Sequence, residues 1–221
     1  MGKMRGQEKD LDSKGSESYE LSPMQQGMLF HFLDEHVPGV DIEQVACRIR
    51  EELDEKSFLR AWQRVTERHP ILRTRFQWGG SDQPRQEVCC DVQVPVAWLD
   101  WTSFTETEIE AYWEDLKQAE RERGFDLAVA PLMRLTIVKR GPADIMVLWT
   151  FHHILLDGRS FPLLLNEVFS FYDAFCRNES LALPQPKPFG DYIHWLRGID
   201  IRRAEFFWRE QLQVSFVPRR R

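Results

Sequence analysis

The stretch Ile145-Met146-Val147-Leu148-Trp149-Thr150-Phe151-His152-His153-Ile154-Leu155-Leu156-Asp157-Gly158-Arg159-Ser160 is the most informative part of this chain. Its first half is a continuous apolar run with the length of a buried strand. Its second half precedes a segment with helical spacing, so His152 and His153 lie where a strand leaves the core. A histidine in that place can present one ring nitrogen to a cavity, and Asp157 can order the turn that follows. The arrangement is typical of a general base without a nucleophilic serine or cysteine beside it.

The segments around this stretch alternate between strands and amphipathic helices. Apolar periodicity predicts strands at 45–49, 71–76, 87–96, 132–139 and 145–151. The turn residues at 141–144 indicate that the last two strands form a hairpin. It predicts helices after Ser22, Asp54 and Thr105, a helix at 161–175, and a terminal helical piece at 191–212. Strands interleaved with helices in this order favour an α/β layered fold.

Two of the helix starts have the sequence of a capping box. Ser22 with Gln25, and Thr105 with Glu108, place a hydroxyl and a longer polar side chain three residues apart. In the first of these helices, Gly27 is expected to mark the close approach of another backbone. The apolar face of that helix is expected to comprise Met24, Met28, Leu29 and Phe32.

Changes in composition divide the chain into four parts. Residues 1–18 are polar and charged and are expected to be a disordered tail, so order should begin near Tyr19. Residues 19–178 are expected to form the main lobe, and 179–190 a stiff, proline-rich linker. Residues 191–221 form a terminal helical piece, which is too short to be a second domain.

Composition limits the possible classes of function. The 221 residues are 43% hydrophobic, which is enough for a domain with a real core. A formal net charge of −6 argues against a nucleic-acid partner, and no apolar run is long enough to cross a membrane. The N-terminus lacks the apolar region of a secretory signal. Because Cys47, Cys89, Cys90 and Cys176 form no CxxC pair, we expect reduced thiols in a cytoplasmic protein, without a disulfide framework or zinc site.

Four stretches, in sequence order, resemble motifs of one protein family. They are 21–31 (LSPMQQGMLFH), 68–76 (RHPILRTRF), 152–158 (HHILLDG) and 189–195 (FGDYIHW). The third resembles the HHxxxDG signature of condensation domains of nonribosomal peptide synthetases. The others resemble the first, second and fourth motifs of that family in the expected order. The opening motif and the form LLDGRS are most similar to the subgroup that takes an upstream D-configured residue.

The resemblance implies a fold. A condensation domain consists of two chloramphenicol acetyltransferase-like lobes arranged as a V. Each lobe is an α/β layered sandwich with a mixed, mainly antiparallel sheet flanked by helices. This chain resembles the N-terminal lobe, with 191–221 as the helical start of a second lobe whose later motifs are absent. The isolated chain is therefore expected to be inactive.

The resemblance also implies an activity and partners. The family forms an amide bond between acyl or peptidyl and aminoacyl thioesters, each tethered to a carrier protein. The implied partners are peptidyl carrier protein domains, the missing C-terminal lobe and adjacent synthetase modules. Both substrates are carried on phosphopantetheine arms, and no cofactor is bound directly.

Five residues receive roles by this resemblance. His153 is the catalytic residue, either as a base or as the acceptor that orients the amine, and His152 supports the loop. Asp157 is a structural carboxylate that is expected to pair with Arg73 of the second motif and so to fix the loop beneath the catalytic histidine. Gly158 allows close approach of the substrate, and its N–H can face the developing negative charge.

Other interpretations of the same residues stay open. His152 and His153 could be satisfied core side chains, or could bind a metal with Asp157, although adjacent histidines on an extended strand point apart. The chain could be a non-catalytic half-domain that binds carrier proteins. It could also be a small oligomeric acyltransferase that uses acyl-CoA, as chloramphenicol acetyltransferase does. In those enzymes the motif lies close to the C-terminus, whereas here a helix, a linker and further helices follow it.

Overall fold

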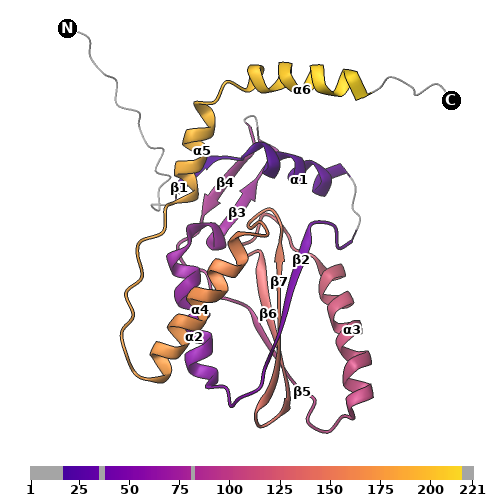
Figure 1. Cartoon of the computed structure of the whole chain (residues 1–221), viewed down its shortest axis with the longest axis vertical. Coiled ribbons are helices and arrows are strands. Elements are labelled where there is room, and N and C mark those ends of the chain that lie inside the picture. The colour runs from indigo at the N-terminus through magenta and orange to yellow at the C-terminus, as the bar shows by residue number, and fades with distance from the viewer. Residues whose placement is uncertain (1–16, 35–37, 81–82, 216–221) are drawn as a thin grey trace, which may run out of the picture.

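The computed structural model describes residues 17–34, 38–80 and 83–215 of the chain (Figure 1). The predicted disordered tail at 1–18 lies mostly outside these residues. Its last two residues, Glu17 and Ser18, belong to a strand, β1 (Glu17–Glu20), so order begins before Tyr19. The predicted terminal piece is described as far as Ser215.

Two sheets form the framework. The larger sheet has the order β2-β7-β6-β5, with β2 at Ile42–Ile49, β7 at Asp144–His152, β6 at Met133–Gly141 and β5 at Val96–Asp100. Only the β5–β6 pair in it is parallel. The smaller sheet is antiparallel, with β1, β4 (Arg85–Val88) and β3 (Thr74–Gln77) in that order. The mixed, mainly antiparallel sheet of the sequence analysis is confirmed.

Helices cover both faces of the larger sheet (Figure 1). The helices are α1 (Pro23–Asp34), α2 (Glu55–Arg68), α3 (Glu106–Arg123), α4 (Ser160–Cys176), α5 (Phe189–Arg197) and α6 (Ile201–Ser215). In β7, Val147 belongs to the large core under α2 and α4, and the next residue, Leu148, to a smaller core under α3. Successive strand residues point to opposite faces. Coverage on both sides therefore explains why β7 is a continuous apolar run.

The predicted helix caps are confirmed. The N–H of Gln25 donates to Ser22 Oγ over 3.2 Å, and the N–H of Ser22 donates to Gln25 Oε1 over 2.9 Å. Thr105 and Glu108 make the same reciprocal pair at the start of α3. Asp54 accepts from the first-turn N–H groups of α2. Each cap pairs donors that a helix start otherwise leaves unpaired.

The expected apolar face of α1 is partly wrong. Met24 is 72% exposed, whereas Gln25 is buried beside Leu29. Gln25 is buried because its amide has partners in the interior, as described below. A Cβ at Gly27 would meet no atom within 4 Å, so this glycine does not mark a close approach among the described residues.

Three predicted elements have other boundaries. Residues 70–73 form a 3-10 turn, so the strand predicted at 71–76 begins at Thr74 and ends at Gln77. Pro70 starts that turn, and its carbonyl accepts from Thr74 Oγ1 over 3.0 Å. The segment 87–96 is extended only at its two ends. The terminal helix is two helices, separated at Gly198–Asp200, where Asp200 accepts from the N–H of Arg202.

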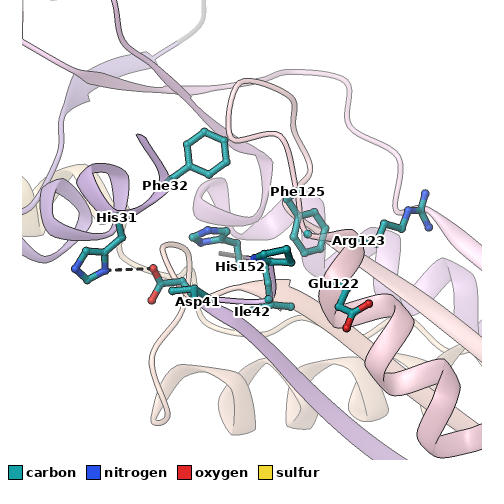
Figure 2. A pocket seen from close by; sticks show the side chains of 12 residues that line it. His31, Phe32, Asp41, Ile42, Glu122, Arg123, Phe125 and His152 are labelled. Atoms are coloured by element: carbon teal, nitrogen blue, oxygen red, sulfur yellow. Dashed lines mark ion pairs between the residues drawn. The ribbon is translucent and has the colours of Figure 1, made fainter. Parts of the chain in front are cut away.

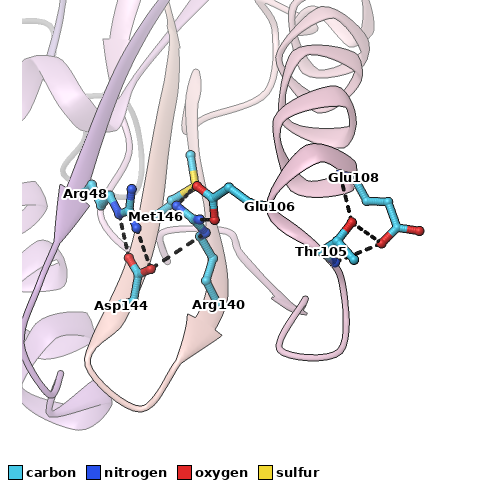
Figure 3. A network of polar contacts seen from close by, with 7 residues as sticks. All are labelled: Arg48, Thr105, Glu106, Glu108, Arg140, Asp144 and Met146. Carbon is cyan, nitrogen blue, oxygen red and sulfur yellow. Dashed lines mark hydrogen bonds and ion pairs between the residues drawn. The ribbon is translucent and has the colours of Figure 1, made fainter.

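A polar network fastens the β6–β7 hairpin to β2 and to the start of α3 (Figure 3). Arg48 pairs with Asp144 through two hydrogen bonds of 2.7 Å. Arg140, whose side chain is only 5% exposed, bonds Glu106 and lies 3.8 Å from Asp144. A buried guanidinium needs such partners, because an unpaired buried charge is strongly unfavourable.

The last two helices lie at one end of the molecule, and α6 extends away from the body (Figure 1). Arg197 of α5 pairs with Glu20 of β1 at 2.7 Å. The large apolar side chains that α5 and α6 expose include Trp195, Phe206, Phe207 and Trp208. In the part of the chain that the structure describes, no helix is both long and apolar enough to cross a bilayer.

Candidate functional site

The two histidines lie where β7 ends and the turn toward α4 begins. The N–H of His152 donates to Leu132 O over 3.0 Å, one residue beyond the pair of Met133 and Phe151 that ends the β6–β7 ladder. The N–H of His153 donates to Asp41 O over 2.7 Å, just before β2. The N–H of Leu155 then returns to His152 O over 3.1 Å. The backbone of the histidine pair is thus fixed from both neighbouring strands.

The ring of His153 is oriented by the turn that follows it. Its Nδ1 lies 2.7 Å from the carbonyl oxygen of Leu156. A carbonyl oxygen can only accept, so Nδ1 carries the proton and Nε2 of the neutral ring keeps its lone pair. The residue is partly exposed at the end of the strand. Such an imidazole can accept a proton from a bound group.

The ring of His152 has the opposite tautomer and surroundings. It is 3% exposed, and its Nδ1 accepts the N–H of Ile154 over 3.1 Å. Burial lowers the pKa of His152 from 6.5 to about 4, against the Asp41 charge, which raises it. The ring is therefore neutral near pH 7 and keeps its acceptor. This geometry suits a residue that holds the turn together, and it does not suit one that exchanges protons.

Asp157 caps α4. Its Oδ1 accepts from Ser160 Oγ at 2.6 Å, from the N–H of Ser160 at 2.8 Å and from the N–H of Arg159 at 3.1 Å. The hydrogen bond from the Ser160 hydroxyl is the main reason that the pKa of Asp157 lies below its ordinary value. Gly158 is exposed, and a Cβ there would meet no described atom within 4 Å. The space beside the turn is therefore open.

The predicted pairing of Asp157 with Arg73 is wrong. The guanidinium of Arg73 donates to three backbone carbonyls, those of Thr66, Glu67 and Cys89. Because 70–73 is a 3-10 turn, Arg73 meets the carbonyls that the last turn of α2 leaves free. It fastens the end of α2 to the segment after β4, and it does not contact the carboxylate beneath His153.

A cavity of about 280 Å³ lies beside His152 (Figure 2). Its lining comes from the end of α1, the start of β2 and the end of α3, and includes His31, Phe32, Asp41, Ile42, Phe125 and His152. His31 Nδ1 lies 3.7 Å from Asp41 Oδ2 at one side. Among the described residues, no group of three or more His, Cys, Asp or Glu side chains is arranged to hold a metal ion.

Comparison with known proteins decides the family. The model of the condensation domain family matches residues 16–219. This chain belongs to the condensation-domain family of nonribosomal peptide synthetases. It is 44% identical over 194 residues to a linear gramicidin synthase protein of Brevibacillus parabrevis, and 33% identical over 195 residues to bacitracin synthase 1 of Bacillus licheniformis. Each match covers 88% of this chain but only 2% and 4% of those relatives.

Solved structures show the same fold. The starter condensation domain of rhizomide synthetase RzmA superposes with a TM-score of 0.74 at 22% identity, over 88% of this chain and 49% of that one. SgcC5 from Streptomyces globisporus gives 0.74 and 22%, over 88% and 46%. The fold is a chloramphenicol acetyltransferase-like α/β sandwich, as predicted. The chain spans about half of those two solved chains.

In this chain, the first motif contacts the third. Gln25 Nε2 donates to Ile154 O over 3.2 Å, directly after the two histidines. The amides of Gln25 and Gln86 also bond each other in both directions, at 3.1 and 2.9 Å. Sequence reasoning assigned Gln25 only to a helix cap. The sequence did contain a signal for its burial, because Gln25 is a polar residue that lies on the same side of α1 as the apolar Leu29.

The second motif contacts α4. Glu167 Oε2 accepts from Arg68 Nε at 3.0 Å and lies 2.9 Å from His69 Nε2. Burial raises the pKa of Glu167, but the hydrogen bonds from Arg68 and His69 outweigh it, so the pKa lies below its ordinary value. Arg68 also bonds Pro184 O over 2.8 Å. The paired basic residues of this motif thus hold α4 and the linker against α2.

Proposed function

We propose that this chain is the N-terminal lobe of a condensation domain that forms an amide bond between two thioesters tethered to carrier proteins. The observation that carries the proposal is the orientation of His153. Its Nδ1–H is held by Leu156 O, which leaves the Nε2 lone pair on a partly exposed ring at the end of β7. The match to the family over 16–219 supports the assignment.

In the proposed reaction, the amine of the downstream aminoacyl thioester attacks the carbonyl carbon of the upstream thioester. His153 Nε2 takes a proton from the attacking nitrogen, or accepts its N–H as a hydrogen bond and so aims its lone pair. The carbon–nitrogen bond forms, the carbon–sulfur bond breaks, and the proton passes to the departing phosphopantetheine thiolate. Positioning of the two tethered groups can supply roughly 7–11 kcal/mol.

The other residues of the motif receive supporting roles in this proposal. His152 and Asp157 hold the turn, the first through the N–H of Ile154 and the second through the start of α4. The N–H of Gly158 faces the oxygen of the thioester as it becomes negative. The open space beside Gly158 supports this role, because a substrate can approach there without meeting a side chain.

The site as proposed is completed by a second lobe. The chain spans 49% and 46% of the two solved chains described above, and α5 and α6 expose several aromatic side chains. Exposed apolar surface of this kind marks a protein interface. We therefore infer partners of three kinds: a C-terminal lobe, peptidyl carrier protein domains that bring both substrates on phosphopantetheine arms, and adjacent synthetase modules. We place this assembly in the cytoplasm, which the four free cysteines support.

An amide-formation assay tests the proposal. Two carrier proteins, one loaded with a D-aminoacyl thioester and one with an L-aminoacyl thioester, are incubated with the chain, with and without a separately expressed C-terminal lobe. We expect dipeptidyl thioester by mass spectrometry only when both lobes are present, and none from His153→Ala. Glu110→Gln, on the exposed side of α3, is the matched control and should retain the rate.

Two outcomes would contradict the proposal. If the His153→Ala variant still forms the amide, the ring of His153 is not the acceptor for the attacking amine. Binding of both carriers by the assembled lobes without any amide product would favour a non-catalytic half-domain.

A further inference from the structure

Asp41 has a backbone conformation that few residues adopt. Its φ is +58°, in the left-handed region, and among the described residues the other non-glycine with positive φ is Asn178, at +55°. Side chains with a Cβ are strained there, and short polar ones such as Asp and Asn tolerate it best. Strained backbone of this kind concentrates at functional sites. Asp41 lies directly before β2 and lines the cavity beside His152.

The carbonyl of Asp41 contacts the backbone of the proposed catalytic residue. In the β2–β7 ladder, Ile42 is paired with His152, so the next position along the ladder brings Asp41 opposite His153. There the N–H of His153 donates to Asp41 O over 2.7 Å. The conformation of residue 41 sets the direction of that carbonyl.

The side chain of Asp41 has a different neighbour. Its Oδ2 lies 3.7 Å from His31 Nδ1 of α1, and the carboxylate is 21% exposed. The carbonyl therefore binds the backbone of His153, whereas the carboxylate acts on the rings of His31 and, through its charge, His152. Substitution can separate them, because Gly and Asn keep the left-handed conformation while removing the charge, whereas a β-branched residue disfavours the conformation.

We propose that Asp41 is a positioning residue for His153: its carbonyl, aimed by the left-handed backbone, holds the N–H of His153 and fixes the ring's direction. Leu156 O then holds the ring by Nδ1, so the histidine is anchored at its backbone and at its side chain. That this anchoring aids catalysis rests on the proposed function, whereas the anchoring of His153 by Asp41 O and Leu156 O does not depend on it.

The test uses the ¹⁵N-labelled 221-residue chain and needs no turnover. NMR measures the hydrogen-exchange rate of the His153 amide and the two imidazole ¹⁵N shifts of its ring in Asp41→Gly, Asp41→Asn and Asp41→Val. We expect the first two to leave the tautomer unchanged and the exchange rate within about twofold. Asp41→Val should raise the exchange rate about tenfold, which is the loss of one hydrogen bond, and should add the Nε2–H tautomer.

Asn178→Val is the matched control. This variant also places a valine at a position with left-handed φ. The position lies beyond the far end of α4, about 25 Å along the 17-residue helix from the histidine turn. It should lose stability in urea as Asp41→Val does, with the His153 signals unchanged. If Asp41→Val does not fold, Asp41→Ala takes its place, with an effect in the same direction.

Two results would overturn the inference. Unchanged His153 signals in Asp41→Val would show that the carbonyl does not position the residue. Altered signals in both Asp41→Gly and Asp41→Asn would assign the effect to the carboxylate instead of the carbonyl. Because none of these signals depends on amide formation, they stand or fall separately from the proposed function.

Discussion

Lowering the pH should destabilise this protein through His152 in particular. The folded protein holds the pKa of this ring at about 4, chiefly by burial, whereas the ordinary value is 6.5. Above pH 6.5 the ring is neutral in both states and contributes no pH dependence. Between pH 6.5 and 4 the unfolded chain binds a proton that the folded chain does not, so the free energy of unfolding falls as the pH falls. Below about pH 4 both states are protonated and the loss is complete.

The size of the loss follows from the two pKa values. Between pH 6.5 and 4 the free energy of unfolding falls by about 1.4 kcal/mol for each pH unit, which gives ~3 kcal/mol over the whole range. Protonation also converts Nδ1 from an acceptor into a donor that faces the N–H of Ile154. The folded ring therefore resists protonation for a structural reason as well as through burial.

Urea unfolding at a series of pH values measures this contribution against His152→Asn. Asparagine keeps an acceptor near the place of Nδ1 but does not titrate, and the other ionisable groups of the chain are common to both proteins. The stability of wild type relative to the variant should fall by ~3 kcal/mol between pH 7 and pH 4. Parallel pH profiles for the two proteins would refute the conclusion that His152 is buried in its neutral form.

Three further predictions concern stability and are measured by urea unfolding. Asp157→Ala should lower the free energy of unfolding by about 0.5–2 kcal/mol, because the N–H groups of Arg159 and Ser160 lose their acceptor at the start of α4, and Asp157→Ser should lose less. Arg73→Met should lower the free energy of unfolding by about 1–3 kcal/mol, because three carbonyls lose their donor. The pKa of Asp157, measured by NMR, should stay unchanged in this variant. A rise in that pKa would show that Arg73 pairs with Asp157 after all. Glu106→Ala should cost about 1–3 kcal/mol, since the buried guanidinium of Arg140 loses a hydrogen-bond acceptor while Asp144 stays 3.8 Å away. The double variant with Arg140→Met should recover part of the loss; an additive double variant would show that the two do not interact.

Short-range rules account for much of the fold. The capping boxes at Ser22 and Thr105, the β6–β7 hairpin and the helical spacing of α4 all depend on residues within a few positions of each other. Such interactions are present in the local sequence, so periodicity and residue type were sufficient to predict them. Pro70 was one exception, because its 3-10 turn replaced the start of a strand whose alternation looked regular.

Residue type and spacing are therefore enough to predict the layered class, the helix starts and the place of His153 at the end of a strand. Three contacts could not be predicted in this way: Arg73 binds three carbonyls, Gln25 is buried against Ile154, and Asp41 O accepts the N–H of His153. The partners in these contacts are up to 129 residues apart in the chain. Such contacts escape prediction because a polar group binds whichever partner the packed elements bring within about 3 Å, and no local pattern encodes that distance.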